Sequence, residues 1–218
     1  MCGILGSISD NKFDYVKGIK SMQHRGPDFN DTFSYDNLIL SHSRLSIIDL
    51  DSKSNQPFSI GYHTIVFNGE IYNFLDLKEI LINEGHEFHT DGDTEVLLLW
   101  LIHKGIERIN EVEGMFAFSW FNKSTKELIL CRDSLGIKPL YIYEDDENLI
   151  FASEIKSIFA LYPNSKKIDK SLIAEYLLNG FIYEPDTGFE KIRKLKPGSY
   201  EKYDLQGNLI TKKQYWEL

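Results

Sequence analysis

Met1-Cys2-Gly3-Ile4-Leu5-Gly6-Ser7-Ile8 opens the sequence with a cysteine directly after the initiator methionine, followed by a short apolar run. Removal of Met1, which the small side chain of Cys2 permits, leaves that cysteine with both a thiol and a free α-amino group. An α-amine titrates at roughly 7.7–8.0 and a thiol at about 8.5, so near neutral pH the amine can relay the thiol proton. The stretch predicts a nucleophile and its base in one residue, at the head of a buried strand over residues 4–8.

Length and composition predict one packed domain. The 218 residues are enough for a full core, and a hydrophobic fraction of 42% with 14 Phe and 12 Tyr is typical of a globular chain. The net charge of −9 arises from scattered acidic residues, which argues against nucleic acid or an anionic membrane as the main partner. We find no 18-residue apolar stretch and no signal peptide, and Cys2 and Cys131 form no disulfide framework. We therefore expect a cytoplasmic protein.

Hydrophobic spacing outward from this stretch predicts strands, two consecutive helices, and strands again. We expect strands over residues 4–8, 38–40, 44–50, 64–67, 115–121, 128–132, 140–143 and 149–152, with a closing hairpin of 200–205 and 209–215. We expect helices over residues 15–23, 74–84, 95–104, 154–161 and 171–178. This order lacks the regular alternation of βαβ units, so two packed sheets with helices outside fit better than a parallel doubly wound sheet.

Three polar segments have a structural and a functional interpretation. Asn68-Gly69 is a hairpin-turn signal, and the dipeptide alone favours that turn. It could also supply two hydrogen-bond donors to a developing oxyanion. Asp93-Thr94 predicts a helix cap. His24-Arg25-Gly26-Pro27-Asp28 predicts a turn with a positional role, because the residue before a proline avoids the helical region.

Other chemistries are weakly supported. His86, His89, Asp91 and Asp93 lie close in sequence, but His-x-x-His in a loop is a weak metal signal, and we expect no metal site. No G-x-x-x-x-G-K-[ST] loop and no G-x-G-x-x-G occurs. Cys131 is expected to be a small core residue in a strand. Lys138 is expected to be solvated or structurally paired.

Nine motifs occur in the order found in one known family. They are Cys2-Gly3-Ile4, His24-Arg25-Gly26-Pro27-Asp28, His42-Ser43-Arg44-Leu45-Ser46-Ile47-Ile48-Asp49, Gln56-Pro57, Asn68-Gly69-Glu70-Ile71-Tyr72-Asn73, Asp93-Thr94-Glu95, Gly114-Met115-Phe116-Ala117-Phe118, Arg132-Asp133-Ser134-Leu135-Gly136-Ile137-Lys138-Pro139-Leu140-Tyr141 and Ser153-Glu154-Ile155-Lys156. With these motifs in this order, the chain resembles the N-terminal glutaminase domain of glutamine-hydrolysing asparagine synthetases, which are class II glutamine amidotransferases. The resemblance covers residues 1 to about 200. We expect residues 1–200 to form that domain and residues 201–218 to form a hairpin and the start of a linker.

The resemblance implies an α+β fold, the four-layer αββα sandwich of the N-terminal nucleophile (Ntn) hydrolases, which agrees with the predicted element order. It implies that Cys2 is the nucleophile, with its own amine as base, and that Asn68 and the Gly69 amide form the oxyanion hole. A planar guanidinium suits a bidentate contact with a carboxylate, and Arg44 would bind the α-carboxylate of glutamine. The residues that would complete the substrate site are Asp93 and Glu70, which would hold the α-ammonium, and Leu45, Ser46, Ile47 and Ile48, which would line the pocket through backbone groups.

The activity implied is hydrolysis of L-glutamine to L-glutamate and ammonia through a γ-glutamyl thioester. No cofactor is implied for this domain. In the family an ATP-dependent synthetase domain with a Ser-Gly-Gly-x-Asp loop follows, and Mg-ATP is expected only there. This chain stops at Leu218 before such a loop. We expect an excised domain rather than a free-standing protein, partnered by that synthetase domain. A second copy of the chain, in a homodimer, is a further candidate partner.

Several alternatives stay open at this point. Aspartate is the default ammonia acceptor, but relatives that act in surface-polysaccharide or peptide pathways share this half. Another class II amidotransferase, of purine or glucosamine synthesis, is a second hypothesis, and the wording of the Arg44–Asp49 and Asn68–Asn73 motifs disfavours it. A non-catalytic module that keeps the fold for docking is the third. It is disfavoured because every proposed catalytic position holds the expected residue.

Overall fold

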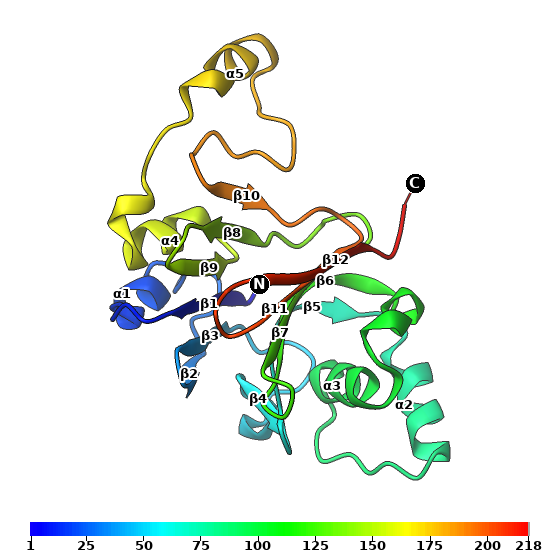
Figure 1. The fold of residues 1–218 in the computed structure, drawn as a ribbon. Helices are drawn as coiled ribbons and strands as arrows, with labels where there is room; N and C mark the ends of the chain where they lie inside the picture. Colours follow the sequence, from blue (N-terminus) through cyan, green and yellow to red (C-terminus); the bar gives the residue numbers. More distant parts are fainter. Residues whose placement is uncertain (218) are drawn as a thin grey trace.

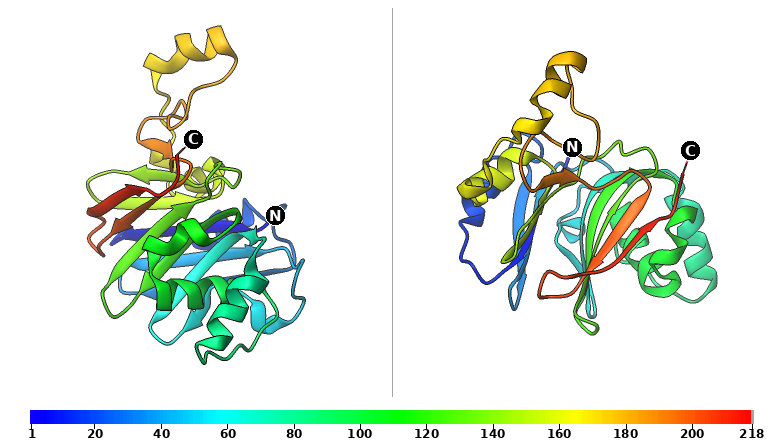
Figure 2. Two further views of the ribbon diagram at one scale, coloured as in Figure 1. Left: turned by 90° about the vertical axis from the view of Figure 1, so that its right-hand side faces the viewer. Right: turned by 45° about the horizontal axis from the view of Figure 1, so that its top comes forward.

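The computed structural model describes residues 1–217, which form two antiparallel six-stranded sheets packed face to face (Figures 1 and 2). In spatial order, sheet A contains β10 (Ile192–Lys194), β8 (Tyr141–Glu144), β9 (Asn148–Ala152), β1 (Gly3–Ser9), β3 (Leu38–Arg44) and β2 (Phe29–Tyr35). Sheet B contains β12 (Leu209–Gln214), β11 (Ser199–Tyr203), β7 (Glu127–Arg132), β6 (Gly114–Asn122), β5 (His63–Ile71) and β4 (Phe58–Ile60).

Helices cover the outer face of each sheet (Figure 2). The helices α1 (Tyr15–Lys20) and α4 (Ile155–Leu161) pack on sheet A, and α2 (Phe74–Asn83) and α3 (Asp93–Lys104) pack on sheet B. The predicted α+β class and the four-layer αββα sandwich are therefore confirmed. Short 3₁₀ turns lie at Ser52–Ser54, Ile106–Glu111, Pro163–Ser165 and Lys170–Leu172. Within residues 1–217, none of the helices has the length and apolar character needed to cross a membrane.

Alternate residues of each strand face different layers, because successive side chains of a strand point to opposite faces. Ile4 of β1, Leu40 of β3 and Val66 of β5 share the core between the two sheets. The neighbouring Leu5 packs in the core under α1 and α4, and Phe67 packs in the core under α2 and α3. Even-numbered positions of these three strands therefore point into the space between the sheets.

Two features of sheet A differ from the sequence predictions. β2 was not predicted, because its sequence FNDTFSY forms a half-exposed edge strand with few apolar residues. The predicted strand over residues 44–50 is wrong: β3 ends at Arg44, and the next residues form a loop around the Arg44 guanidinium. Ile47 is 70% exposed there, so the apolar run that indicated a strand is not a core segment.

The predicted hairpin turn at Asn68-Gly69 is also wrong. Both residues lie inside β5, opposite Ala117 and Phe116 of β6. A Cβ on Gly69 would lie 2.4 Å from the Met115 carbonyl oxygen, so a close approach of the two strands excludes a side chain. The glycine here marks a crowded strand pair, although Asn-Gly is typical of a turn.

An arm, residues 163–191, leaves the sandwich after α4 and returns to it at β10. It carries α5 (Ile173–Asn179) at its tip (Figure 1). The α5 helix buries none of its side chains, and Leu177 and Leu178 are 76% and 85% exposed. This apolar exposure is unusual for a helix that packs against its own domain.

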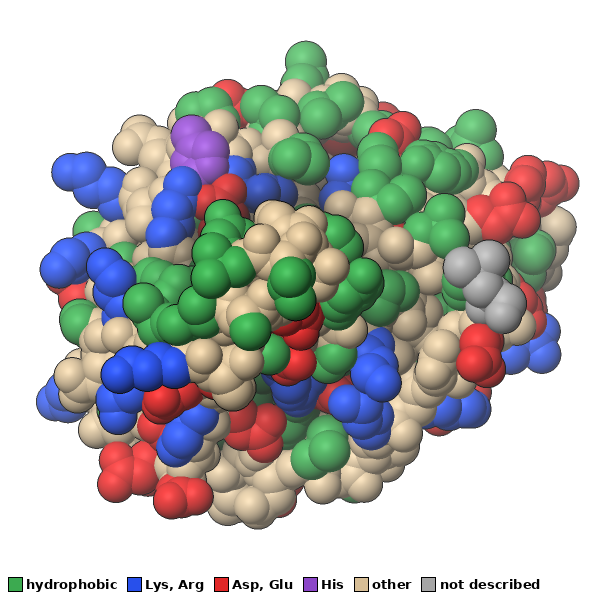
Figure 3. Space-filling view, turned by 90° about the horizontal axis from the view of Figure 1, so that it is seen from above, with side chains coloured by type: hydrophobic (Ala, Val, Ile, Leu, Met, Phe, Trp, Pro, Cys, Tyr) green, Lys and Arg blue, Asp and Glu red, His purple; other side chains and the backbone are tan. Residues whose placement is uncertain are grey.

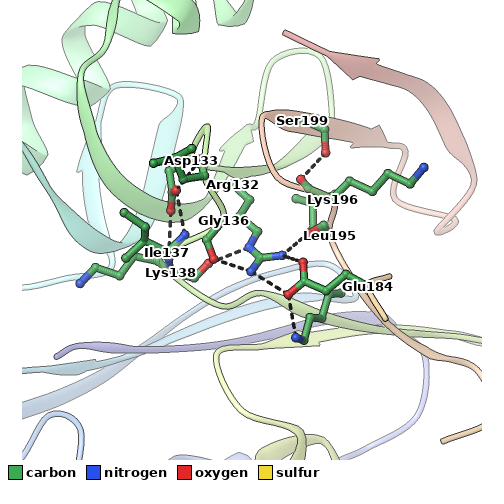
Figure 4. A network of polar contacts seen from close by, with 11 residues as sticks. Arg132, Asp133, Gly136, Ile137, Lys138, Glu184, Leu195, Lys196 and Ser199 are labelled. Carbon is green, nitrogen blue, oxygen red and sulfur yellow. Dashed lines mark hydrogen bonds and ion pairs between the residues drawn. The ribbon is translucent and has the colours of Figure 1, made fainter. Parts of the chain in front are cut away.

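A buried turn after β7 joins sheet B to the base of the arm (Figure 4). Arg132 donates to the Leu195 carbonyl oxygen at 2.7 Å and to the Glu184 carboxylate at 2.9 Å. The Asp133 carboxylate, 1% exposed, accepts hydrogen bonds from the backbone N–H groups of Phe116, Leu135, Ile137 and Lys138. Two adjacent charged side chains therefore satisfy the backbone of an irregular buried segment.

Replacing Asp133 by alanine is expected to lower the free energy of unfolding by at least about 3 kcal/mol, because buried N–H groups lose their acceptor. Urea unfolding of the variant and the wild type measures this difference. Asp204→Ala is a matched control, since Asp204 accepts from Gln206 and Asn208 N–H groups in the solvent-facing β11–β12 turn. A loss that is equal in the two variants would show that the buried Asp133 network contributes no more to stability than the exposed Asp204 turn.

Candidate active site

A cavity of about 180 Å³ lies where the residues just before β1 and the end of β3 meet the edge of sheet B. Nine of the ten predicted site residues line it: Cys2, Arg44, Leu45, Ile47, Ile48, Asn68, Gly69, Glu70 and Asp93. The tenth, Ser46, does not line the cavity. A larger hollow of about 990 Å³ at the opposite end of the strands is lined by turn residues and strand ends, and by none of the predicted site residues.

Cys2 is placed by the strand that it precedes. It has the same parity as Ile4 in β1, which faces the space between the sheets. The Cys2 Sγ donates to the Leu45 carbonyl oxygen at 3.6 Å and accepts from the Leu45 N–H at 3.5 Å. Burial raises the pKa of the Cys2 thiol, so the thiolate requires help to form.

The segment 24–28 holds two walls of the cavity, Cys2 and the loop after β3, which agrees with its predicted positional role. Arg25 donates from Nε to the Cys2 carbonyl oxygen at 2.9 Å and from a terminal nitrogen to Glu154 at 3.1 Å. Asp28 accepts from the Ser46 N–H at 2.8 Å. Ser46 therefore belongs to the framework of the loop, behind the cavity surface.

The third wall is the unpaired edge of β5. β4 pairs with residues 63–65 only, so the outward N–H groups beyond them have no partner strand. The Phe67 N–H donates to Gln56 Oε1 at 2.6 Å, and the Ile71 N–H donates to Asp93 Oδ2 at 3.0 Å. Because N–H groups of a strand alternate between its two edges, the Gly69 N–H faces the same edge, midway between them.

Asn68 points to the inner face of sheet B, toward sheet A. Its side chain is 1% exposed, and its Nδ2 is buried without a hydrogen-bond partner among residues 1–217. Buried polar groups are nearly always satisfied, so an unpartnered amide on a cavity wall indicates a donor that is kept for a ligand. Asn68 Nδ2 and the Gly69 N–H thus supply adjacent donors to the cavity.

Arg44 has a structural role that the sequence did not predict. One terminal nitrogen donates to the Asp51 carbonyl oxygen at 3.0 Å and to Asn55 Oδ1 at 2.5 Å, and the other donates to the Asp49 carbonyl oxygen. The side chain is 7% exposed and lines the cavity. It organises the loop that follows β3 and places a positive charge beside Cys2.

Asp93 is the first residue of α3, and Gly92 takes the cap position that the sequence assigned to Asp93-Thr94. The carboxylate is 6% exposed and accepts from the Ile71 N–H across the edge of β5. Burial raises the pKa of Asp93 to about 6, and the negative charge of Glu70 adds to this effect. Arg44 and Asp93 provide the cavity with opposite charges.

Gln56 and Lys138 are among the lining residues that the sequence did not assign to the site. Gln56, 5% exposed, bridges the Phe67 N–H and the Thr94 hydroxyl, and the Gln56-Pro57 motif was the only sequence signal for it. Lys138 was expected to be solvated or paired, but it is 6% exposed and lines the cavity. Figure 4 shows its side chain extending away from Arg132.

The weak metal signal has no counterpart in the fold. His86 stacks on His103 with ring centroids 3.8 Å apart, and the His89 N–H donates to Glu95. Across the described part of the chain, no three His, Cys, Asp or Glu side chains gather as a metal site.

Comparison with known proteins agrees with this geometry. Residues 1–216 match the glutamine amidotransferase domain family. The chain belongs to that family. It is similar to asparagine synthetase [glutamine-hydrolyzing] 1 of Bacillus subtilis, with 38% identity over 100% of this chain and 35% of the relative. It is equally similar, at 38%, to the putative asparagine synthetase [glutamine-hydrolyzing] 2 of Methanocaldococcus jannaschii, over 100% of this chain and 47% of the relative.

The glutamine amidotransferase domain thus spans less than half the length of these two curated relatives. Among solved structures, glutamine phosphoribosylpyrophosphate amidotransferase from B. subtilis superposes with a TM-score of 0.75 at 19% identity, over 100% of this chain and 50% of that chain. At this identity the likeness concerns the fold, and it agrees with the two packed antiparallel sheets of this chain.

The raised pKa of Asp93 predicts a pH-dependent stability. Between an ordinary carboxyl pKa of about 4 and the folded value of about 6, the folded chain keeps a proton that the unfolded chain has lost. Stability therefore falls as pH rises through this window. Asp93→Asn cannot ionise, so its stability relative to wild type should rise by about 2–3 kcal/mol between pH 3.5 and pH 7.5.

Denaturant unfolding of wild type and Asp93→Asn at both pH values measures this change, and any constant effect of the lost carboxylate cancels. Asp91→Asn, at an exposed neighbouring position, is the control and should follow the wild type. An Asp93→Asn curve parallel to wild type at the two pH values would contradict the assigned burial effect.

Proposed function

We propose that this amidotransferase domain hydrolyses L-glutamine with Cys2 as the nucleophile. The observation that carries the proposal is the buried, unpartnered Asn68 Nδ2 on the wall of the cavity that the Cys2 thiol also lines. A thiol opposite two preorganised donors is the arrangement that acyl transfer from an amide requires.

Each step of the proposed reaction uses groups of this chain. After Met1 is removed, the Cys2 α-amine accepts the thiol proton, and the thiolate attacks the side-chain carbonyl carbon of glutamine. Asn68 Nδ2 and the Gly69 N–H donate to the oxyanion. The C–N bond of the substrate amide breaks, and the departing nitrogen takes the proton from the protonated Cys2 amine. Ammonia is released, and a γ-glutamyl thioester remains on Cys2. Water, deprotonated by the same amine, cleaves the thioester to glutamate and restores the thiol.

The head group of glutamine would bind between opposite charges. The Arg44 guanidinium would face the α-carboxylate, and Asp93 with Glu70 would face the α-ammonium. The loop that begins at Leu45 would contact the side chain of the substrate through backbone groups of residues 45–48. Because the pKa of Asp93 lies at about 6, this carboxylate is charged under neutral conditions and loses its charge in mild acid.

The proposal is tested by intact mass and a glutaminase assay. Loss of Met1, followed by one adduct of a diazoketone glutamine analogue on Cys2 that excess glutamine prevents, is the expected result. Cys2→Ala should abolish glutamate release. Cys131→Ala is the matched control, since Cys131 is fully buried in β7 and should leave the activity unchanged. Absence of hydrolysis in a chain free of Met1 would refute the catalytic proposal and favour a docking module.

Asp93→Asn is expected to raise KM for glutamine about 10- to 100-fold at pH 8, because the α-ammonium loses a charged hydrogen-bond partner worth about 1.5–3 kcal/mol. The difference from wild type should shrink at pH 5, where Asp93 is largely protonated. Steady-state kinetics at the two pH values, with Asp91→Asn as control, measure this. An unchanged KM at pH 8 would remove Asp93 from the substrate site.

We further propose that the ammonia serves a following ATP-dependent synthetase domain, with aspartate as acceptor, because the relatives are asparagine synthetases of more than twice this length. The exposed Leu177 and Leu178 of the arm would contact that domain, and Figure 3, which looks down on the arm, shows hydrophobic side chains gathered on this face. Mg-ATP would bind to the synthetase domain. Glutamine-dependent asparagine formation by a longer chain that contains this domain is the test, with surface-polysaccharide or peptide acceptors as the alternatives.

Both cysteines, Cys2 and Cys131, are free thiols, the state that a reducing compartment maintains. We therefore place the proposed reaction in the cytoplasm.

A further inference from the structure

Phe67, the residue before Asn68, has both of its backbone polar groups held by side chains from other layers. Its N–H donates to Gln56 Oε1 at 2.6 Å, and its carbonyl oxygen accepts from His42 Nε2 at 3.0 Å. Beyond residue 65, β5 has no strand on this edge, so these side chains replace the missing ladder. The two bonds fix the peptide planes on both sides of Phe67.

His42 reaches Phe67 across the space between the sheets. It lies in β3 with the parity of Leu40, which faces sheet B, and it is 1% exposed. A carbonyl oxygen only accepts, so Nε2 carries the hydrogen. Burial lowers the pKa of His42 to about 4, and the ring is therefore neutral under neutral conditions. A neutral, buried histidine of this kind acts as a fixed donor without titrating.

Gln56 connects the same peptide to the start of α3. Its Oε1 accepts from the Phe67 N–H, and its Nε2 donates to the Thr94 hydroxyl at 3.2 Å. Thr94 follows Asp93, whose carboxylate holds the Ile71 N–H four residues further along β5. Gln56 and Asp93 thus anchor the strand on both sides of Asn68-Gly69, and His42 adds a third anchor from the other sheet.

We propose that His42 and Gln56 are positioning residues for the glutaminase reaction, because they fix Phe67 so that Asn68 Nδ2 and the Gly69 N–H meet the developing oxyanion. This inference rests on the proposed function. Neither residue is assigned contact with the reacting atoms. A purely structural role would also satisfy buried polar groups, but it would not act selectively on the transition state, where oxyanion donors are used.

The test compares His42→Leu, which removes the donor, with His42→Gln, whose terminal amide can replace the Nε2 donor. A displacement of about 1 Å in a catalytic group costs about 10²-fold in rate. We expect His42→Leu to lower kcat about 100-fold with KM for glutamine within about threefold of wild type, and His42→Gln to return kcat to within about tenfold. Equal loss of kcat in both variants, or a loss that appears in KM, would overturn the proposal.

Gln56 gives an independent pair of variants if His42→Leu does not fold. Gln56→Glu keeps an acceptor for the Phe67 N–H, and Gln56→Met removes it. The expected order of kcat is wild type, Gln56→Glu, then Gln56→Met, with circular dichroism and thermal midpoints recorded for each. The same kcat in both Gln56 variants would overturn the role of this residue.

Two reference measurements accompany these variants: glutamine hydrolysis by wild type and by Cys2→Ala, and the rate of alkylation of the Cys2 thiol. Hydrolysis by wild type and its loss in Cys2→Ala test the proposed function itself, so a failure there is distinct from a failure of the positioning role. Alkylation of Cys2 by iodoacetamide forms no oxyanion, and its rate in His42→Leu should stay within about twofold of wild type. A parallel fall in alkylation and hydrolysis would show a displaced thiol and overturn the assignment to the oxyanion donors.

Discussion

β5 continues past the end of its short neighbour β4, and the N–H groups on that edge need partners that no strand supplies. Gln56 serves Phe67 and Asp93 serves Ile71, which leaves the Gly69 amide between them facing the cavity. An unpaired edge is normally a liability for a sheet protein. Here the side chains of Gln56 and Asp93 cover part of the edge, and the uncovered part forms a wall of the cavity.

The alternation that builds the core also builds the site. The side chains of β1 and β3 that face sheet B are apolar in the middle of the sandwich. At one end the same faces continue into polar side chains, Cys2 just before β1 and Arg44 at the end of β3, which line the cavity. Packing and chemistry therefore share one geometric rule, and the site needs no insertion into the fold. The arrangement is unfavourable for stability at Asp93, where burial holds the pKa of a carboxyl at about 6.

Much of this was predictable from the sequence, and the gaps have physical causes. Apolar periodicity predicted the central strands and the buried helix α3, because those segments owe their conformation to burial. It missed β2, whose residues are mostly polar, and it misread Asn68-Gly69, whose strand conformation depends on β6 lying close by. The resemblance carried by the ordered motifs indicated nine of the lining residues. Lys138 and His42 also lie in those motifs, but the place of Lys138 in the cavity and the contact of His42 with Phe67 depend on register and on the distance between the two sheets. Spacing along a chain does not encode either quantity.

The position of β1 at the centre of sheet A has a consequence for the timing of synthesis. β1 precedes both of its neighbours, β3 and β9, in the chain, and β9 ends at Ala152. At about 5–20 residues per second, the ribosome takes on the order of ten to thirty seconds to reach β9. Throughout that interval β1 lacks one of its two partner strands. Closure of sheet A on both sides of β1 therefore waits until about 140 further residues have been made.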